Sequence, residues 1–225
     1  MAKPRLRASP ASPWSKTDAW TVLGVFERRG LLLGIGIALC AYGAWNAWSL
    51  RSIARAPGVL APDEPLQQNY EPLPPAFDHE GYSIQPLAAF SLQARVLSRS
   101  DYHLDRMSSL IPTDLALGWG AMSDSAVLRT IKIEQSDRFY FWSASEFPIP
   151  RREIETHSAN MHLIPADGLV RRALRRIRPG ALIQLSGQLV EVHAPAGWSV
   201  RSSMTRDDTG AGACEVVWVE SLEAH

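Results

Sequence analysis

The sequence predicts a mainly β domain of the α+β class, a small twisted barrel or sandwich with one or two short helices, preceded by a single transmembrane helix. Three features of the chain lead to this prediction. Residues 30–50 form an uncharged apolar run, residues 51–86 are rich in proline, and residues 87–225 contain short runs in which apolar and polar residues alternate. Alternation with a period of two is typical of half-buried β-strands. We therefore expect an arm at 1–29, a membrane span, a linker and one β domain.

The apolar run is long enough to cross a lipid bilayer. As a helix it would extend about 32 Å, against about 30 Å for the hydrocarbon core. Basic residues outnumber acidic ones in the preceding arm. The basic residues there are Lys3, Arg5, Arg7, Lys16, Arg28 and Arg29. Positive charge favours the cytoplasmic side of a span. We therefore expect a single-pass protein of the inner (cytoplasmic) membrane, with its N-terminus in the cytoplasm and its C-terminal domain periplasmic or extracellular.

A cleaved signal peptide is the alternative to a retained anchor. Ala54-Arg55-Ala56 has the small-x-small pattern of a cleavage site, but Pro57 follows it and the apolar run is longer than is usual for a signal peptide. We therefore expect the anchor to be retained. A spacing of four between small residues lets two helices approach closely. That spacing predicts a possible homodimer through Gly30, Gly34 and Ala38.

The linker at 51–86 contains seven prolines. Proline-rich segments favour the extended polyproline II conformation, with about 3.1 Å per residue. We therefore expect a spacer that holds the β domain away from the bilayer. Partial packing of this segment on the domain is the alternative.

Strands are predicted where the alternation is clearest. Residues 90–96 alternate regularly, which indicates a half-buried strand. Residues 138–142 carry aromatic side chains on both faces, which indicates a strand that is central or covered on both sides. Residues 183–192 change the parity of their apolar positions next to Gly187, where a bulge or sharp bend is expected. A final apolar strand is expected at 214–219.

Two helices are predicted from their end signals. Asp167 is a typical N-cap residue, and an apolar stripe with helical spacing follows it until Pro179-Gly180 ends the helix. Ser123 or Asp124 is expected to cap a second, short helix.

The succession of helix, Arg-Pro-Gly, strand, glycine and strand within residues 138–220 resembles the later half of an OB (oligonucleotide/oligosaccharide-binding) barrel, in which a helix lies between the third and fourth strands. The resemblance implies an OB-like barrel. Many such barrels bind a ligand or partner on one face of the sheet. The resemblance assigns no role to any named residue of this chain.

Charge and cysteine content narrow the possible functions. The 23 basic and 23 acidic residues balance each other. Non-specific nucleic-acid binding needs a strongly basic surface, so we expect no nucleic-acid partner. The two cysteines cannot form a disulfide within the β domain, because Cys40 is in the span. We expect Cys214 to be a small buried hydrophobic residue.

Polar residues cluster in the stretch that starts at His157. We interpret the stretch as a structural loop or as a polar pocket for a ligand or partner, with candidate contacts from His157, Ser158, Asn160 and His162. Metal binding is a further alternative, although a spacing of five between the histidines and the lack of a nearby Cys or Glu cluster speak against it. Trp119, between two glycines, is either a core residue or an exposed contact.

The predicted helix after Asp167 is rich in arginine. We interpret its charged face as a solvated surface or as a binding face for an anionic lipid, a polysaccharide or an acidic partner. The candidate binding residues are Arg171, Arg172, Arg175 and Arg176.

Together these features predict a membrane-anchored envelope protein whose β domain is a binding or assembly module for another envelope protein. The sequence lacks a convergent acid, base and nucleophile set and a phosphate-binding glycine loop, so we expect no cofactor and do not assign an enzyme activity. The alternative is an envelope hydrolase or metal-dependent enzyme centred on His157 and His162.

Overall fold

The computed structural model describes residues 31–45, 51–210 and 212–225. The chain divides into two compact units, with the boundary between Trp48 and Ser49. In the first unit, residues 31–45 are helical.

No helix in the described part of the chain is both long and apolar enough to cross a membrane. The expected arm, Gly30 and residues 46–50 of the expected span lie outside that part. Gly34 and Ala38 lie within the helical residues, and the homodimer through them stays a prediction.

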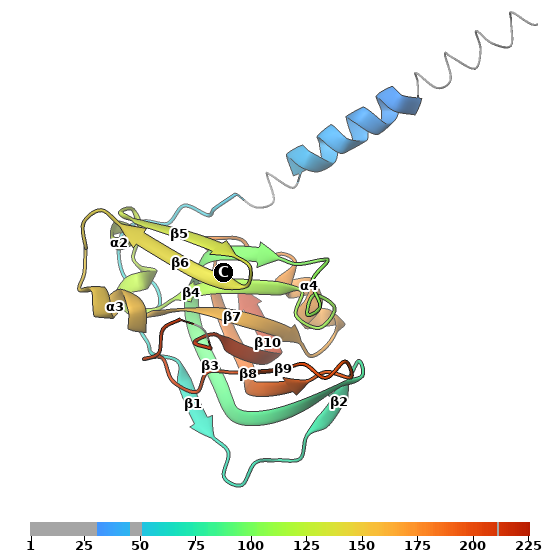
Figure 1. Ribbon diagram of the computed structural model, residues 1–225. Helices are drawn as coiled ribbons and strands as arrows, with labels where there is room; N and C mark the ends of the chain where they lie inside the picture. Colours follow the sequence, from blue (N-terminus) through green and yellow to red (C-terminus); the bar gives the residue numbers. More distant parts are fainter. Residues whose placement is uncertain (1–30, 46–50, 211) are drawn as a thin grey trace, which may run out of the picture. The chain divides into compact units, whose positions relative to one another are not determined.

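The second unit is mainly β, which confirms the predicted class (Figure 1). The strands are β1 (Leu66–Asn69), β2 (Phe77–His79), β3 (Tyr82–Asp101), β4 (Thr113–Gly118), β5 (Ile131–Ser136), β6 (Phe139–Ala144), β7 (Ser158–Pro165), β8 (Leu182–His193), β9 (Ser199–Arg201) and β10 (Glu215–Ala224). The helices are the 3₁₀ helix η1 (Gly120–Ser123) and the α-helices α2 (Ser125–Leu128), α3 (Arg151–Thr156) and α4 (Gly168–Leu174).

Five strands pair in a closed order. β3 pairs with β4, β4 with β7, β7 with β10, β10 with β8, and β8 again with β3. The β7–β10 pair is parallel and the other four pairs are antiparallel. The long, curved β3 also pairs with β1 and β2, and β9 pairs with β8 (Figure 1).

The main hydrophobic core lies among these five strands. The predicted alternation at 90–96 is confirmed, because Phe90, Leu92 and Ala94 are buried while the residues between them are more exposed. Helix α4 adds Val170 and Leu174 to the same core. A second buried cluster includes Ile84, Leu110, Ile111, Ile164, Val190, Val192, Val216 and Trp218.

The predicted N-caps are confirmed, whereas α4 ends at Leu174, before the predicted stop at Pro179-Gly180. The Asp167 carboxylate accepts hydrogen bonds from the backbone N–H groups at the start of α4. At the other end, the Arg99 guanidinium donates to the carbonyl oxygens of Leu174 and Ile177, at 2.7 and 2.6 Å. A cation there also complements the helix dipole. The Asp124 carboxylate caps α2 in the same way as Asp167 caps α4.

Gly187 lies where two strands approach most closely. A Cβ atom at this position would be 1.9 Å from the carbonyl oxygen of Trp218, so only glycine fits. The pairing of β10 with β8 shifts just beyond this point, between Val219 and Ser221. The parity change along β8 is confirmed as well, since the neighbours Leu189 and Val190 are both buried.

Residues 51–86 contact the β domain along much of their length. β1 and β2 both pair with β3, and β3 itself begins at Tyr82. Ala61 is fully buried, and its N–H and that of Leu60 both donate to the Ser123 hydroxyl at 3.0 Å. The prolines interrupt the segment but leave enough N–H groups for these bonds.

The aromatic stretch at 138–142 lies in a hairpin outside the closed set of strands. β6 pairs with β5 in a separate two-stranded sheet, and Phe139 and Phe141 are 43% and 53% exposed. The prediction that this strand is central or covered on both sides is therefore wrong. The hairpin turn uses Asp137 and Arg138 with φ of +52° and +70°. Such φ values suit the tight turn of a two-residue hairpin.

Candidate functional site

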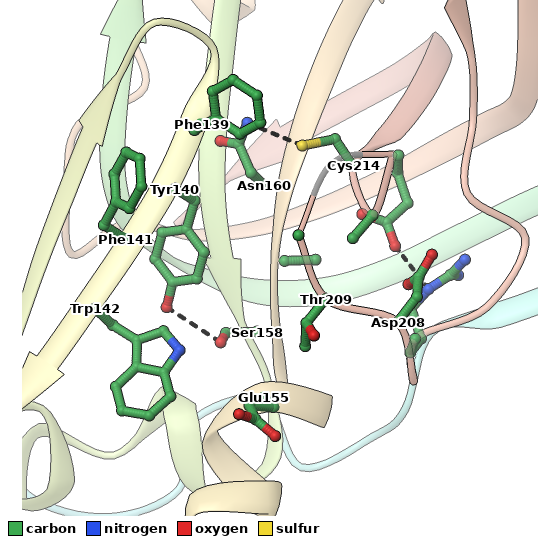
Figure 2. A pocket seen from close by; sticks show the side chains of 15 residues that line it. Phe139, Tyr140, Phe141, Trp142, Glu155, Ser158, Asn160, Asp208, Thr209 and Cys214 are labelled. Atoms are coloured by element: carbon green, nitrogen blue, oxygen red, sulfur yellow. Dashed lines mark hydrogen bonds and ion pairs between the residues drawn. The ribbon is translucent and has the colours of Figure 1, made fainter.

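A cavity of about 290 Å³ opens between the β5–β6 hairpin and the loop that leads into β10. Figure 2 shows Phe139, Tyr140, Phe141 and Trp142 of β6 on one side and Cys214, Thr209 and Asp208 on the other. The cavity is also lined by α3 and by the start of β7. It therefore lies on the outer face of β7, covered from two sides by long connections.

The aromatic wall is well ordered by its neighbours. The Tyr140 hydroxyl donates to the Ser158 hydroxyl at 3.1 Å, which in turn donates to the carbonyl oxygen of Ile154 at 2.7 Å. Burial raises the pKa of Tyr140 to about 12, so its hydroxyl stays protonated at physiological pH. Trp142 packs edge-on against Phe147. The exposed rings of Phe139 and Phe141 are 6.3 Å apart and leave apolar surface at the cavity mouth.

Asn160 forms part of the polar floor and its amide orientation is set by three contacts. Its Oδ1 accepts from the Gln135 side chain at 2.7 Å, and its Nδ2 donates to the carbonyl oxygen of Arg138 at 3.0 Å. The same Nδ2 donates to the sulfur of Cys214 at 3.7 Å. The second contact fixes which end of the amide is the donor, because a carbonyl oxygen only accepts, so an N–H group points at the sulfur (Figure 2).

Cys214 lines the cavity and is half-buried. The expectation that it is a small buried hydrophobic residue is therefore wrong. Cys214 is also one of the groups that raise the pKa of His162, so the two side chains interact electrostatically. The thiol thus connects the cavity with a group of ionisable side chains beneath it.

His162 and Asp114 form the buried part of that group. They are register partners on β7 and β4, and Nδ1 of His162 lies 2.9 Å from Oδ2 of Asp114. Burial lowers the pKa of His162, but the hydrogen bonds and charges of Asp114 and Cys214 outweigh it and raise the pKa to about 9. His162 is therefore an imidazolium at neutral pH.

Arg138, in the turn of the β5–β6 hairpin, forms an ion pair with the Asp114 carboxylate. Its Nη1 lies 3.0 Å from Oδ1 of Asp114, and its other nitrogens bind the Asp105 carboxylate. The guanidinium also stacks on the Tyr102 ring, 3.7 Å from its centroid. Asp114 is fully buried, and each of its two oxygens lies next to a cation, Arg138 or His162. This arrangement compensates the loss of hydration that a buried carboxylate suffers.

A second buried acid lies at the opposite wall. Glu215 is almost fully buried, and its Oε1 lies 2.7 Å from Nε of Arg206. Burial raises the pKa of Glu215 to about 7, which the charge of Arg206 only partly offsets. The loop before β10 is held by the Ser203 hydroxyl, which donates to the Asp208 carboxylate at 2.7 Å, and by Arg152, which pairs with Asp207.

The site combines an apolar aromatic wall, a polar floor and a thiol that touches a buried ion pair. No protein-family model, curated protein or solved structure matches the chain. The wall can hold an aliphatic or aromatic group, and Ser158 and Asn160 contribute polar atoms to the lining. In the described residues, no group of three or more His, Cys, Asp or Glu is arranged to hold a metal ion.

The structure separates the candidate residues of the polar stretch. Ser158 and Asn160 line the cavity, and His162 follows on the same face of β7. His157 instead pairs with Glu64, with 3.0 Å between Nε2 and Oε1. The two histidines thus have different carboxylate partners and do not form one centre. Trp119 is fully buried, and its Nε1 donates to the other oxygen of Glu64 at 2.8 Å, which makes it a core residue.

The arginines of α4 and of the turn that follows it do not line the cavity. Arg171 pairs with Glu80 at 3.1 Å, and Arg172, Arg175 and Arg176 are exposed. These contacts do not distinguish a solvated surface from a binding face. The role of the arginines in binding an anionic lipid, a polysaccharide or an acidic partner therefore stays a prediction.

Sequence reasoning missed the residues that complete the site. They are Asp114, the exposed aromatic residues of β6, Cys214 and Glu215. A glycine-rich loop immediately before a cysteine at a strand start was the available signal for Cys214. Its partners Asp114 and His162 come from other strands, and nothing in their spacing along the chain marks them as neighbours.

Proposed function

We propose that this protein is a single-pass membrane protein whose β domain binds another envelope protein in the cavity between the β5–β6 hairpin and the loop before β10. The observation that carries the proposal is the 290 Å³ cavity with exposed aromatic rings at its mouth. Monomeric domains rarely expose neighbouring aromatic side chains unless they bind something. Aromatic anchors in pockets are also typical of the centre of protein interfaces.

The ligand that fits best is an extended polypeptide segment. β6 pairs with β5 alone among the described strands, so its second edge can accept main-chain hydrogen bonds. Apolar side chains of the segment would enter the aromatic cavity, and Glu155 and Asp208 place acidic groups at its wall. A basic residue in the segment would therefore add to binding.

We further propose that the domain is an OB-like barrel. Numbering β3, β4, β7, β8 and β10 as strands one to five, the closed pairing follows the order 1-2-3-5-4-1, with a helix between the third and fourth. Partner binding in OB barrels commonly uses the face of the second and third strands and the adjacent loops. The cavity lies on β7, the third strand of this numbering, which supports the proposal.

Anchoring in the inner membrane is part of the same proposal. The uncharged run at 30–50, the basic arm before it and the exposed Leu and Ile side chains of the helical residues 31–45 support it. A reporter enzyme fused after His225 should be active only outside the cytoplasm. Activity confined to the cytoplasm, or full-length protein in the soluble fraction, would exclude the anchor.

The binding proposal is tested by co-purification from solubilised membranes. Phe141→Ala, which removes a ring 53% exposed, should reduce the recovery of the bound envelope protein by at least about tenfold. Leu104→Ala is the matched control, because Leu104 is fully exposed and does not line the cavity. Equal recovery with both folded variants would refute binding at this cavity.

A further inference from the structure

Cys214 lies between the cavity and the buried ion pair of Asp114 and His162. Its sulfur lines the cavity and accepts a hydrogen bond from Asn160 at 3.7 Å. Nδ1 of His162 lies 2.9 Å from the Asp114 carboxylate, and Cys214 is one of the groups that raise the pKa of His162. Since Nδ1 faces the carboxylate, Nε2 is the ring nitrogen that remains for the thiol.

We propose that Cys214 is a nucleophile, that His162 exchanges a proton with it, and that Asp114 orients the imidazole, so that the cavity catalyses acyl transfer from an ester, thioester or peptide carbonyl. This inference goes beyond the proposed binding function. It uses the same cavity but does not depend on the identity of the envelope partner.

Charge and hydrogen bonding around the sulfur favour its nucleophilic form. A thiolate is stabilised by a neighbouring cation and by N–H donors. Both are present, because the Asp114 carboxylate 2.9 Å from His162 favours the charged imidazolium and the Asn160 amide points its N–H at the sulfur. The other charged groups that face this pair are Asp114, Arg138, Glu215, Arg206 and Asp208.

A nucleophile, a proton carrier and an orienting carboxylate form the set that covalent acyl transfer requires. Asp114 comes from β4 and His162 from β7, and Cys214 is the residue immediately before β10. These strands are neighbours in the closed sheet, so Asp114 and His162 are held on rigid elements and Cys214 is adjacent to the first residue of a third strand.

The reaction balances with water as the co-substrate. The sulfur of Cys214 bonds to the carbonyl carbon, the bond to the leaving group breaks, and the leaving group departs with the proton of His162. Water then attacks the resulting thioester and gives a proton to His162. The carbon–sulfur bond breaks, which releases the carboxylic acid and restores the thiolate and imidazolium.

A second feature of the cavity points to a ligand or water beside the sulfur. Glu215 lines the same cavity and is almost fully buried, yet its Oε2 has no hydrogen-bond partner in the described part of the chain. An unpaired buried carboxyl oxygen is costly unless something else binds it.

The test uses the full-length protein in detergent with Cys40→Ala, which leaves Cys214 as the only thiol because the chain has two cysteines. Alkylation by iodoacetamide is measured from pH 5 to pH 10 and compared with glutathione. We expect Cys214 to react at least about tenfold faster than glutathione at pH 6. With p-nitrophenyl acetate we expect a burst of nitrophenol and an acetyl group on Cys214, detected by mass spectrometry.

Three variants assign the roles. In the same background, His162→Asn should slow alkylation at pH 6 by at least about tenfold and give the pH profile of an ordinary thiol, with a midpoint near about 8.5. Asp114 is a positioning residue, and Asp114→Asn should lower the rate of acetylation. It should also shift the pH profile of alkylation toward that of an ordinary thiol. His157→Asn is the matched control, since His157 pairs with Glu64 and should leave the profile unchanged.

The proposal is overturned if folded Cys40→Ala protein shows an ordinary thiol profile and accepts no acetyl group, or if His162→Asn leaves both readouts unchanged. Should His162→Asn fail to fold, the profile and acetylation of the Cys40→Ala protein alone decide. Phe141→Ala separates this proposal from the binding function. If the variant loses the envelope partner but is alkylated normally, the binding function is supported and the thiol chemistry is judged from the other variants. If the partner is recovered equally, binding at the cavity is refuted and the thiol chemistry is unaffected.

Discussion

Asp114 and His162 face each other across β4 and β7, with a 2.9 Å contact between carboxylate and imidazole in a place from which water is almost excluded. Arg138 holds the second oxygen of Asp114 from the turn of the β5–β6 hairpin. One buried carboxylate thus connects the closed sheet, the hairpin and, through His162, the thiol at the cavity. The site therefore depends on the charge state of this group.

The stability of the domain should fall as the pH rises through the titration of His162. Its pKa is about 9 when folded and near 6.5 when unfolded, so its stabilising contribution is complete below about pH 6.5 and is lost as the pH rises through 9. The difference corresponds to about 3 kcal/mol. Urea unfolding of wild type and His162→Gln between pH 6 and 10 measures it, and a difference between them that does not change with pH would contradict the shift.

Glu215 should make the domain less stable between pH 4.5 and 7. The folded protein keeps the carboxyl proton up to a pKa of about 7, while the unfolded chain releases it near 4.5. Stability therefore decreases by up to about 3 kcal/mol as the pH rises across this interval. Glu215→Gln should remove the decrease. Equal slopes for the two proteins in denaturant titrations would show that Glu215 titrates normally.

Ser123→Ala should release the proline-rich segment from the domain. It deprives the part-buried N–H of Leu60 and the buried N–H of Ala61 of their acceptor, at a cost of roughly 1–3 kcal/mol. Limited proteolysis should then cut within residues 57–65, which wild type should resist. Ser145→Ala is the control, because Ser145 is exposed. Identical cleavage patterns would mean that the segment is held by other contacts.

Gly187→Ala should destabilise the fold by more than about 3 kcal/mol. The new methyl group would lie 1.9 Å from a carbonyl oxygen of β10, so one of the two strands must move. Ser186→Ala, at the neighbouring exposed position of β8, should change stability by less than about 1 kcal/mol. Thermal unfolding followed by circular dichroism compares them, and similar midpoints would be inconsistent with the close approach.

The features predicted from sequence are those with local signals. Asp167 and Pro179-Gly180 mark the ends of α4 within a few residues, and Gly187 marks the bend in β8. Each depends on a capping group or a backbone conformation that neighbouring residues reveal. The mainly β class follows from the same local alternation.

What the sequence could not reveal depends on pairing between distant strands. β1 lies in a stretch whose prolines indicate a spacer, and it pairs with a distant part of β3, with Leu66 opposite Ser91. The aromatic residues at 139–142 indicate a buried strand, whereas the hairpin leaves Phe139 and Phe141 exposed. Ser158 and Asn160 were found because they lie two residues apart in the same polar stretch.

The candidate thiol shows the same limit more sharply. Cys214, considered alone, is a small apolar residue next to a strand. Its position beside His162 follows from the parallel pairing of β7 with β10, and the charge of His162 follows from its register with Asp114. Neither pairing has a signal in the residues themselves.

The most direct test of the proposed binding cavity is site-specific photo-crosslinking in native membranes. A benzophenone amino acid in place of Phe141 should give one discrete adduct with an envelope protein after irradiation, because this side chain lies at the cavity mouth. The same amino acid in place of the fully exposed Leu104 should not give that adduct. No adduct from position 141, or the same adducts from both positions, would contradict the account.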